Sequence, residues 1–381
     1  MSNRKTKGIL IVILFLSVTQ IEAAWTAPFR ITYNSGLSGD PRIVVDGSFI
    51  YLVWGDNTSG NYEIYFKKSL DGGTTWQPVK RLTYNSMTSR YPEIAVTGLN
   101  IFVVWRNQPP DKFGGDIYFR KSTDGGTTWL PAKRLTYNFY DANPAVAVSG
   151  SNIYVVFARF YDKKIFLKKS TDGGNTWQPL KTLFISDYQV SLGDPAVAVS
   201  GSNIYVVWPD MQLIEMNYLI YFIKSTDGGN TWQPFKRLTN NPRNCNFPDI
   251  AVSKSNIYVI WNEKSSEDDE IYFRTSSDGG NVWQTCKRLT YNSGDSIRPD
   301  INFIGSNIYV TWEDYSPGNA EIYIKKSFDN GANWQVPQRL TYNSGRSMSP
   351  QIGFNTTKIY VFWFDDNPGN CEIFQKNSPI F

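Results

Sequence analysis

Short runs of β-branched and aromatic residues recur along the chain at near-regular intervals. The run at residues 49–54 reads Phe-Ile-Tyr-Leu-Val-Trp, with Gly and Ser before it and polar residues after it. Both of its alternating faces are apolar, which is typical of a strand buried between two neighbouring sheets. The same pattern returns at residues 100–105, 152–157, 203–208, 256–261, 307–312 and 358–363. The pattern therefore predicts seven equivalent buried strands.

Three further strand-like pieces surround each buried strand. In the first repeats they are represented by residues 92–96, which precede such a strand, and by 63–67 and 75–82, which follow one. No helical periodicity is visible in residues 25–381. Four strands in each of seven repeats predict an all-β fold, a seven-bladed β-propeller with four antiparallel strands per blade.

A polar turn motif, Ser-x-Asp-Gly/Asn-Gly-x-x-Trp, marks six of the repeats. Its aspartates are Asp71, Asp124, Asp172, Asp227, Asp278 and Asp329. They recur roughly every 51 residues, which is close to the length of a propeller blade and longer than most helical repeats. The motif predicts a tight turn between the third and fourth strands of each blade.

The two ends of the repeat array are complementary. Residues 25–34 read as a fourth strand with no strands before it, whereas residues 372–378 read as a third strand with no turn after it. We therefore predict that the N-terminal strand completes the last blade, which removes the exposed edge of an open array. Residues 25–381 are then a single propeller domain.

The chemistry of the turn motif predicts a structural role. The two glycines permit positive φ angles, and the Asp and Ser side chains can bond to backbone groups that a tight turn leaves unpaired. The Trp can pack a large face between blades. Each turn offers only one carboxylate, too few for a calcium site. We expect no metal and no cofactor.

The six turns resemble the Asp-box, or BNR, repeat of the sialidase-like superfamily, and the resemblance extends over essentially all of residues 25–381. It implies that the turns lie on the face opposite the usual ligand site. The superfamily includes sialidases, other glycosidases, lectins and non-catalytic scaffolds, so the resemblance implies an architecture rather than an activity.

Sialidase activity would imply an arginine triad, a Tyr-Glu nucleophile pair and an aspartate acid/base on six blades. Here there are seven repeats, and Arg30, Arg81, Arg134, Arg237, Arg288 and Arg339 occupy one repeated fourth-strand position. Arginines on successive blades cannot converge, so we interpret them as ion partners. Seven other arginines fall in loops of the expected ligand face, where three could converge: Arg42, Arg90, Arg106, Arg159, Arg243, Arg298 and Arg346.

Two repeated loop sequences favour binding over catalysis. Buried strands end in Trp-x-acid or its amide version, at Asp56, Asn107, Asp210, Glu263, Asp314 and Asp365. Fourth strands run into Thr-Tyr-Asn, with tyrosines at 33, 84, 137, 291 and 342. An aromatic ring beside a carboxylate and an amide can bind a sugar, and several equivalent pockets gain from multivalency. Alternatively, these side chains cap loops.

One sector, between Phe157 and Cys245, departs from the repeat. If the protein has a single asymmetric catalytic site, its first candidates are Arg159 as anion contact, Tyr161 as nucleophile, and Asp210 and Glu215 as acid and base. Neutral drift of the loops would explain the same divergence. The leading prediction is therefore a binding module, with an exo-acting sialidase-type glycosidase and a ligand-free scaffold as the alternatives.

Composition narrows the remaining possibilities. The chain has no histidine, which excludes His-based acid/base catalysis and His-ligated zinc, and its net charge of +4 does not indicate a nucleic-acid binder. A basic start and an apolar run predict a signal peptide over residues 1–24, hence a secreted or periplasmic protein without a later membrane span. We expect a monomer whose partner is an extracellular glycan or a cell-surface protein. One disulfide, most plausibly Cys245–Cys286, remains open.

Overall fold

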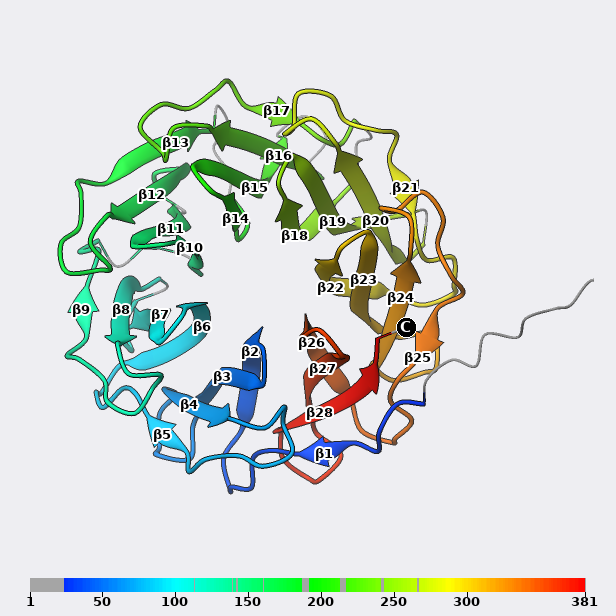
Figure 1. Ribbon diagram of the computed structural model, residues 1–381, viewed down its shortest axis with the longest axis horizontal. Helices are drawn as coiled ribbons and strands as arrows, with labels where there is room; N and C mark the ends of the chain where they lie inside the picture. Colours follow the sequence, from blue (N-terminus) through cyan, green and yellow to red (C-terminus); the bar gives the residue numbers. More distant parts are fainter. Residues whose placement is uncertain are drawn as a thin grey trace, which may run out of the picture.

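The protein is a ring of seven antiparallel sheets around a central opening (Figure 1). The computed structural model describes residues 24–380 apart from 113, 139, 142, 160, 187–191, 213–216, 241–242 and 266. Each sheet has four strands, which confirms the predicted seven-bladed propeller. The predicted signal peptide falls almost wholly outside the described residues and stays a prediction.

Within each blade the strands follow one another from the central opening outward (Figure 1). Blade 1 consists of β2 (Ser38–Asp46), β3 (Phe49–Asp56), β4 (Glu63–Ser69) and β5 (Lys80–Arg81). Blades 2 to 4 are β6 (Thr88–Thr97), β7 (Asn100–Gln108), β8 (Asp116–Ser122) and β9 (Lys133–Arg134); β10 (Ala145–Ser149), β11 (Asn152–Arg159), β12 (Lys164–Ser170) and β13 (Lys181–Ile185); β14 (Ala196–Ser200), β15 (Asn203–Gln212), β16 (Asn217–Ser225) and β17 (Lys236–Arg237). Blades 5 to 7 are β18 (Cys245–Ser253), β19 (Asn256–Lys264), β20 (Asp269–Ser276) and β21 (Lys287–Arg288); β22 (Ser296–Ile304), β23 (Asn307–Asp314), β24 (Glu321–Ser327) and β25 (Gln338–Arg339); β26 (Ser347–Phe354), β27 (Lys358–Asp365), β28 (Glu372–Pro379) and β1 (Phe29–Arg30).

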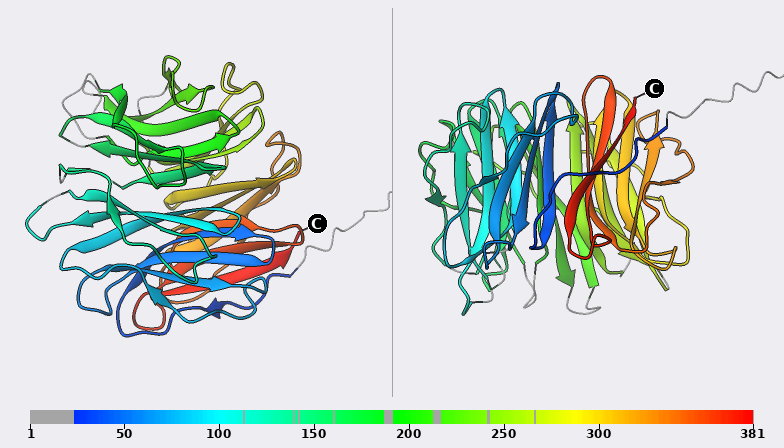
Figure 2. Two further views of the ribbon diagram at one scale, coloured as in Figure 1. Left: turned by 60° about the vertical axis from the view of Figure 1, so that its left-hand side comes forward. Right: turned by 90° about the horizontal axis from the view of Figure 1, so that it is seen from below.

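The N-terminal strand closes the ring, as the sequence predicts. Strand β1 pairs antiparallel with β28, placing Phe29 opposite Gln375 and Arg30 opposite Phe374. In Figures 1 and 2 the blue N-terminal strand lies against the red C-terminal strand. Blade 7 therefore has four strands drawn from both ends of the chain, and its third strand is not left as an open edge.

The apolar core is divided into seven clusters that lie between neighbouring blades. The six tryptophans that end second strands, such as Trp54, are at most 1% exposed. The motif tryptophans also pack across the blade boundaries. The ring of Trp129 in blade 2 meets Phe66 of blade 1 edge-on, with centroids 5.1 Å apart. Each blade is thus stabilised by burial against its two neighbours.

The fourth strands are shorter than the sequence predicts. Of the expected residues 75–82, only Lys80 and Arg81 form a strand in blade 1. Pro78 has no N–H to donate to a ladder, so pairing before Lys80 is limited to the bond from Gln77 N to Lys68 O, at 2.8 Å. Strand β13 in blade 3 is the longest of these outer strands, with five residues.

The Asp-box turns have the bonds expected of them. In blade 1, Gly72 and Gly73 have φ angles of 67° and 79°. Gly73 N donates to Ser69 Oγ, and Thr75 N donates to Asp71 Oδ1, both at 2.8 Å. The hydrogen bonds from Thr75 lower the pKa of Asp71 to about 2. The carboxylate is therefore occupied within its own turn.

Candidate functional site

The Asp-box hairpins and the hairpins between first and second strands share one face of the ring. Their proximity is shown by the bond from Gly72 N in a box to Ser48 O between β2 and β3, at 2.8 Å. The loops from second to third strands and the connections between blades lie at the opposite ends of the strands, on the other face. That second face is where the sequence predicts a ligand.

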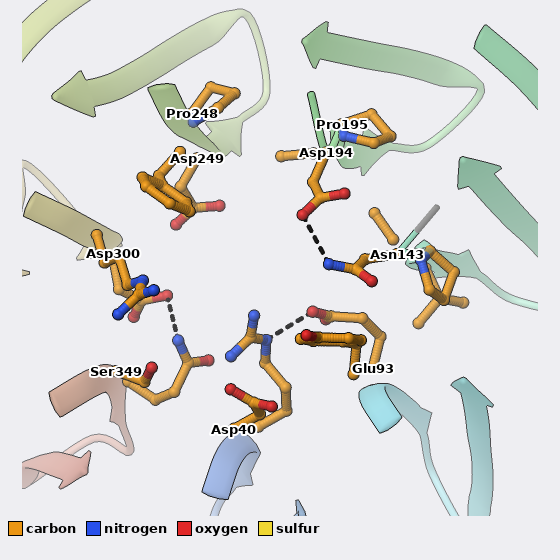
Figure 3. Close-up of a pocket in the computed structure, with 18 of the residues that line it drawn as sticks. Asp40, Glu93, Asn143, Asp194, Pro195, Pro248, Asp249, Asp300 and Ser349 are labelled. Carbon is orange, nitrogen blue, oxygen red and sulfur yellow. Dashed lines mark hydrogen bonds and ion pairs between the residues drawn. The ribbon is translucent and has the colours of Figure 1, made fainter. Parts of the chain in front are cut away.

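A repeated proline, which the sequence analysis did not recognise, marks the inner strand of every blade on this second face. The prolines are Pro41, Pro92, Pro144, Pro195, Pro248, Pro299 and Pro350, spaced by 51 to 53 residues. All of them are buried. The residues on either side of these prolines line one cavity of about 560 Å³ at the centre of the ring (Figure 3). Their common spacing is the signal that would have found this site.

In five blades a β-bulge changes the direction of the inner strand. The residue before the proline has a positive φ of 49° to 54° in Asp40, Tyr91, Phe247, Arg298 and Ser349. The register of the inner strand shifts at each of these positions. Such bulges bend a strand end and redirect its side chains. The described inner strands of blades 3 and 4 pair without a register shift.

Three arginines from the sequence list, Arg42, Arg90 and Arg298, do converge on the cavity, together with Tyr91 and Glu93. Arg42 Nε lies 2.5 Å from Glu93 Oε1. Arg90 lies 3.6 Å from Asp40, and Arg298 lies 3.3 Å from Glu313. Each arginine is therefore neutralised by a carboxylate.

Tyr91 and Glu93 are not joined to each other. The Tyr91 ring lies between two guanidinium groups, 5.1 Å from Arg90 and 4.7 Å from Arg106, while Glu93 is engaged by Arg42. The residue types of a sialidase site are thus present, but the Tyr-Glu contact that activates such a nucleophile is not made.

Three more carboxylates face the cavity from blades 4, 5 and 6 (Figure 3). Asp194 accepts a bond of 2.7 Å from Asn143 Nδ2. Asp249 accepts from Ile301 N at 3.0 Å. Asp300 accepts from Gln351 Nε2 at 3.1 Å. These bonds join neighbouring blades, so the carboxylates also stabilise the ring.

Carboxyl groups outnumber arginines in the lining of the cavity. Burial raises the pKa of Glu93, Asp194, Asp249 and Asp300 above the usual range of carboxyl groups. With Asp40 there are five carboxylates against three arginines around the same space. Because a raised pKa favours the protonated form, these carboxyl groups carry less negative charge than their number suggests, and the lining offers a ligand both hydrogen-bond acceptors and donors.

The predicted Trp-x-acid residues lie apart from this cavity, one in each blade except blade 3, whose second strand ends in Arg159. Asp56 is 1% exposed and accepts bonds from Ser38 Oγ at 2.6 Å and Asn34 Nδ2 at 2.7 Å. Equivalent bonds, from the corresponding Asn or Ser or from the strand's own Trp, reach Asn107, Asp210, Glu263, Asp314 and Asp365. These side chains tie a blade connection to the end of a second strand, the capping role that was the alternative.

The Thr-Tyr-Asn tyrosines, by contrast, are exposed to solvent. Tyr33, Tyr84, Tyr137, Tyr291 and Tyr342 are 70–73% exposed. Each ring stacks on the fourth-strand arginine of its own blade, at 4.5–4.7 Å. Because blades 5, 6, 7, 1 and 2 are consecutive around the ring, the five tyrosines form an arc on the face of the channel mouth.

The same arginines are ion partners, as the sequence predicts, and their partners lie within the blade. Arg81 Nη2 lies 2.9 Å from Glu63 Oε1, and Glu63 is fully buried. The other pairs are Arg30–Glu372, Arg134–Asp116, Arg288–Glu270 and Arg339–Glu321.

The three described candidates of the divergent sector each have a partner of their own. Arg159 is 6% exposed and lies 2.6 Å from Asp141 and 3.2 Å from Asp162. Tyr161 is 66% exposed and packs on Tyr140, with ring centroids 4.5 Å apart. Asp210, on β15 of blade 4, is buried and accepts a hydrogen bond of 2.8 Å from Ser186 Oγ, which follows the outer strand of blade 3. Glu215 lies outside the described residues.

The described residues also bear on the expectations about disulfides, metal sites and membrane spans. Cys245, Cys286 and Cys371 are free thiols; Cys245 is buried on an inner strand, whereas Cys286 is exposed beside the outer strand of the same blade. No group of three or more acidic, Cys or His residues in this part of the chain is placed to hold a metal ion. It also contains no helix long and apolar enough to cross a membrane.

Known proteins with this architecture act on or bind different partners. The chain aligns with the phage phi92 endosialidase (TM-score 0.57, 11% identity) over 93% of its own length and 69% of that chain. It aligns with a Trypanosoma rangeli sialidase in complex with sialic acid (0.54, 12%) over 91%, spanning about half of that chain, 54%. A polysaccharide lyase, Uly1 (0.59, 9%), aligns over 90% of this chain and 89% of its own.

At such identities these likenesses show the fold alone. YCF48 bound to a D1 peptide is a further match, with a TM-score of 0.54, 14% identity and coverage of 92% and 96%. No curated protein is similar enough in sequence to count as a relative. The profile of the BNR repeat-like domain, however, matches residues 12–259, more than half of the chain. The chain therefore belongs to the family of BNR repeat-like β-propellers.

Proposed function

We propose that this protein is an extracellular binding module that holds one hydroxyl-rich glycan end in the central cavity. The observation that carries the proposal is the convergence of side chains from all seven inner strands on one space of about 560 Å³. A cavity of this size suits one or two sugar units, and convergent polar groups on a rigid scaffold give a site its orientation.

The chemistry of the lining supports a neutral sugar. Carboxylates and amides, such as Asp194, Asp300 and Asn143, accept and donate bonds to hydroxyl groups. Tyr91 and Phe364 supply flat apolar surface in the same cavity. Because Arg42, Arg90 and Arg298 are already paired, an anionic sugar would have to displace a carboxylate partner from each arginine.

The arc of exposed tyrosines supports a longer ligand. These rings are more than two-thirds exposed although one face of each is covered by arginine. A glycan chain leaving the channel mouth would meet this arc, and stacking on its rings would add weak contacts by multivalency. The buried Trp-x-acid residues take no part in this version of the site.

The proposal is tested by screening the secreted form of the chain on a glycan array and titrating any hit. We expect Asp194→Asn and Glu93→Gln each to weaken binding about tenfold or more, because each replaces one carboxyl oxygen of the cavity by an amide nitrogen that can only donate. Asp111→Asn, which changes an exposed carboxylate away from the cavity, is the matched control and should bind as the wild type. Absence of any glycan ligand would refute the proposal.

A sialidase-type glycosidase is the second candidate, favoured by the meeting of three arginines, Tyr91 and Glu93 in one cavity. It requires rearrangement of the Arg42–Glu93 pair when substrate binds. Release of fluorophore from a fluorogenic sialoside, lost in both Arg42→Ala and Glu93→Gln but kept in Asp111→Asn, would favour this candidate over the binding module.

A further inference from the structure

The inner strands of blades 3 and 4 have no long side chain at the position that follows the repeated proline. This position is Ala145 in blade 3 and Ala196 in blade 4, whereas the other blades have a charged residue or an amide there: Arg42, Glu93, Asp249, Asp300 and Gln351. Each of these residues pairs with the one just before the Trp or Phe of the neighbouring second strand. The positions are therefore structurally equivalent, and two adjacent blades lack the side chain.

In blades 5 and 6 this side chain binds the inner strand of the following blade. Ile301 N donates to Asp249 Oδ2 at 3.0 Å, and Ile352 N donates to Asp300 Oδ2 at 2.7 Å. An innermost strand has a sheet partner on one side only, so the backbone groups of its other edge need a side chain, water or a ligand. The aspartates satisfy one such N–H group in each of two blades.

Blade 4 has the same backbone group without the acceptor. Val197 pairs with Val206 as Ile301 pairs with Val310, so the N–H groups of Val197 and Ile301 have the same direction. The residue of blade 3 in the place of Asp249 is Ala145, whose side chain cannot accept a bond. Val197 lines the central cavity, and among the described residues no side chain accepts from its N–H group.

The two alanines leave their neighbours uncovered. Val146 and Val197 are partly exposed, whereas the equivalent Ile250, Ile301 and Ile352 of blades 5, 6 and 7 are only 4–7% exposed. All five residues of β14 are partly exposed. The lining of the cavity includes Ala145, Val146, Ala196 and Val197, which we call the blade 3–4 recess. The recess is therefore an apolar part of the cavity that no side chain of these two strands fills.

A carboxyl group borders the recess. Asp194 comes two residues before Ala196 and faces the cavity (Figure 3). It accepts one bond, from Asn143 Nδ2 at 2.7 Å. Because a carboxylate has about four acceptor positions, Asp194 can also accept a bond from a ligand. The recess and its border thus combine a backbone donor, a small apolar surface and an acceptor.

We propose that the blade 3–4 recess binds the acetamido group of an N-acetylhexosamine, which specifies the glycan end proposed above and rests on that proposal. The methyl group packs on Ala145 and Ala196, the carbonyl oxygen accepts from Val197 N, and the amide N–H donates to Asp194. The carbonyl then takes the place that Asp249 and Asp300 occupy on the following strands. A carboxylate offers the acceptor, but neither the donor nor the methyl group.

The test titrates the full chain by calorimetry with methyl β-glycosides of N-acetylglucosamine, N-acetylgalactosamine, glucose and galactose. We expect the better N-acetyl sugar to bind at least about tenfold more tightly than its hydroxyl counterpart, since it adds two hydrogen bonds and a buried methyl group. Equal binding of the two overturns the acetamido site and leaves the glycan-binding function standing. Failure of every glycan, here and on the array, overturns both.

A variant locates the preference in the recess. Ala145→Asp supplies the acceptor that blades 5 and 6 have, so it should occupy Val197 N and bring the N-acetyl and hydroxyl sugars within about twofold of each other. Ala132→Asp makes the same change at an exposed position outside the cavity and should keep the full preference. A preference that survives Ala145→Asp contradicts the proposal.

A second variant serves if Ala145→Asp does not fold. Ala196→Val adds two methyl groups to the recess without a charge and should weaken binding of the N-acetyl sugar more than that of the hydroxyl sugar. Saturation-transfer NMR on the wild type gives an independent measurement, in which the acetamido methyl protons should receive more saturation than the ring protons. A folded Ala196→Val with unchanged preference, or a methyl signal weaker than the ring signals, refutes the acetamido site.

Discussion

Blades 5, 6, 7, 1 and 2 hold their loops by one set of contacts, and blades 3 and 4 by another. In the five-blade arc, a fourth-strand arginine pairs with a buried third-strand carboxylate and a tyrosine covers the arginine, as in Arg81, Glu63 and Tyr84. In blades 3 and 4 the described residues contain neither this ion pair nor the stacked tyrosine.

In blade 3 a buried ion pair takes the place of the hydrogen bond that joins Ser38 to Asp56 in blade 1. The charged groups are exchanged, because the second strand carries the arginine and the blade connection carries the aspartate. Arg159 stands at the end of a second strand, where Asp56 stands in blade 1, and Asp141 occupies the position of Ser38. Between blades 3 and 4, Phe184 and Leu192 join the apolar cluster of Trp208. The comparison teaches that the propeller tolerates an exchange of polar for apolar contacts, because each boundary needs only to bury its surface and satisfy its charges.

The largest expected effect is at the buried pair of blade 3. Arg159→Ala leaves Asp141, which is fully buried, without its ion partner, and we expect a loss of about 3–5 kcal/mol in the free energy of unfolding. Denaturant titration measures it. Arg346→Ala, in an exposed pair with Asp366, is the control and should cost less than about 1 kcal/mol. Equal costs would mean that the blade 3 pair is not a structural contact.

The apolar replacement is tested next. Phe184→Ala removes a 7% exposed ring that packs on Trp208 with centroids 4.9 Å apart, and should cost about 3 kcal/mol through cavity formation. Tyr84→Ala removes a 70% exposed ring from the other sector and should cost about 0.5 kcal/mol. The same denaturant titration compares them. A larger loss from Tyr84→Ala would reverse the interpretation of the two sectors.

The repeated ion pair should have an intermediate effect. Arg339→Ala leaves the buried Glu321 short of a donor, at a cost of about 1–2 kcal/mol, moderated by the partial exposure of the arginine. Arg237, at the same position in blade 4, is exposed, and within the part of the chain that the structure describes its side chain donates only to Asn240 Oδ1, at 3.5 Å. Arg237→Ala should therefore be nearly neutral, and thermal unfolding of the two variants checks the difference.

The smallest effect is one that both sectors share. The pKa of Asp71 is lowered to about 2, below the value of about 3.9 in an unfolded chain. Its contribution to stability is therefore complete above pH 4 and is lost as the pH falls toward 2. Asp71→Asn in blade 1 and Asp172→Asn in blade 3 should each make unfolding less dependent on pH in this window. If the pH dependence of unfolding changed in only one of the two variants, the turns of the two sectors would not be equivalent.

Much of the architecture could be predicted because its causes are local. The alternating strands, the glycine turns and the missing strand at each end lie within single repeats, so they fixed the number of blades and the closure by Phe29 and Arg30. The short fourth strands were not predicted, because the effect of Pro78 on pairing depends on the neighbouring strand β4.

The site was harder to predict because burial is decided between repeats. Asp56 looks like a solvent-facing acid in the sequence, yet Asn34, 22 residues earlier, covers it. Arg42 and Glu93 are 51 residues apart and meet only because the ring brings their inner strands together. Their shared proline context was visible in the sequence, but its position at the channel was not.

By itself, the sequence determined the repeat, the turn chemistry and the seven-bladed ring, since the apolar strand runs and the Asp-box turns are encoded within about 50 residues. Only the tertiary structure decided which polar groups are used up in the scaffold and which face a cavity. The physical reason is that desolvation and pairing depend on neighbours from other blades.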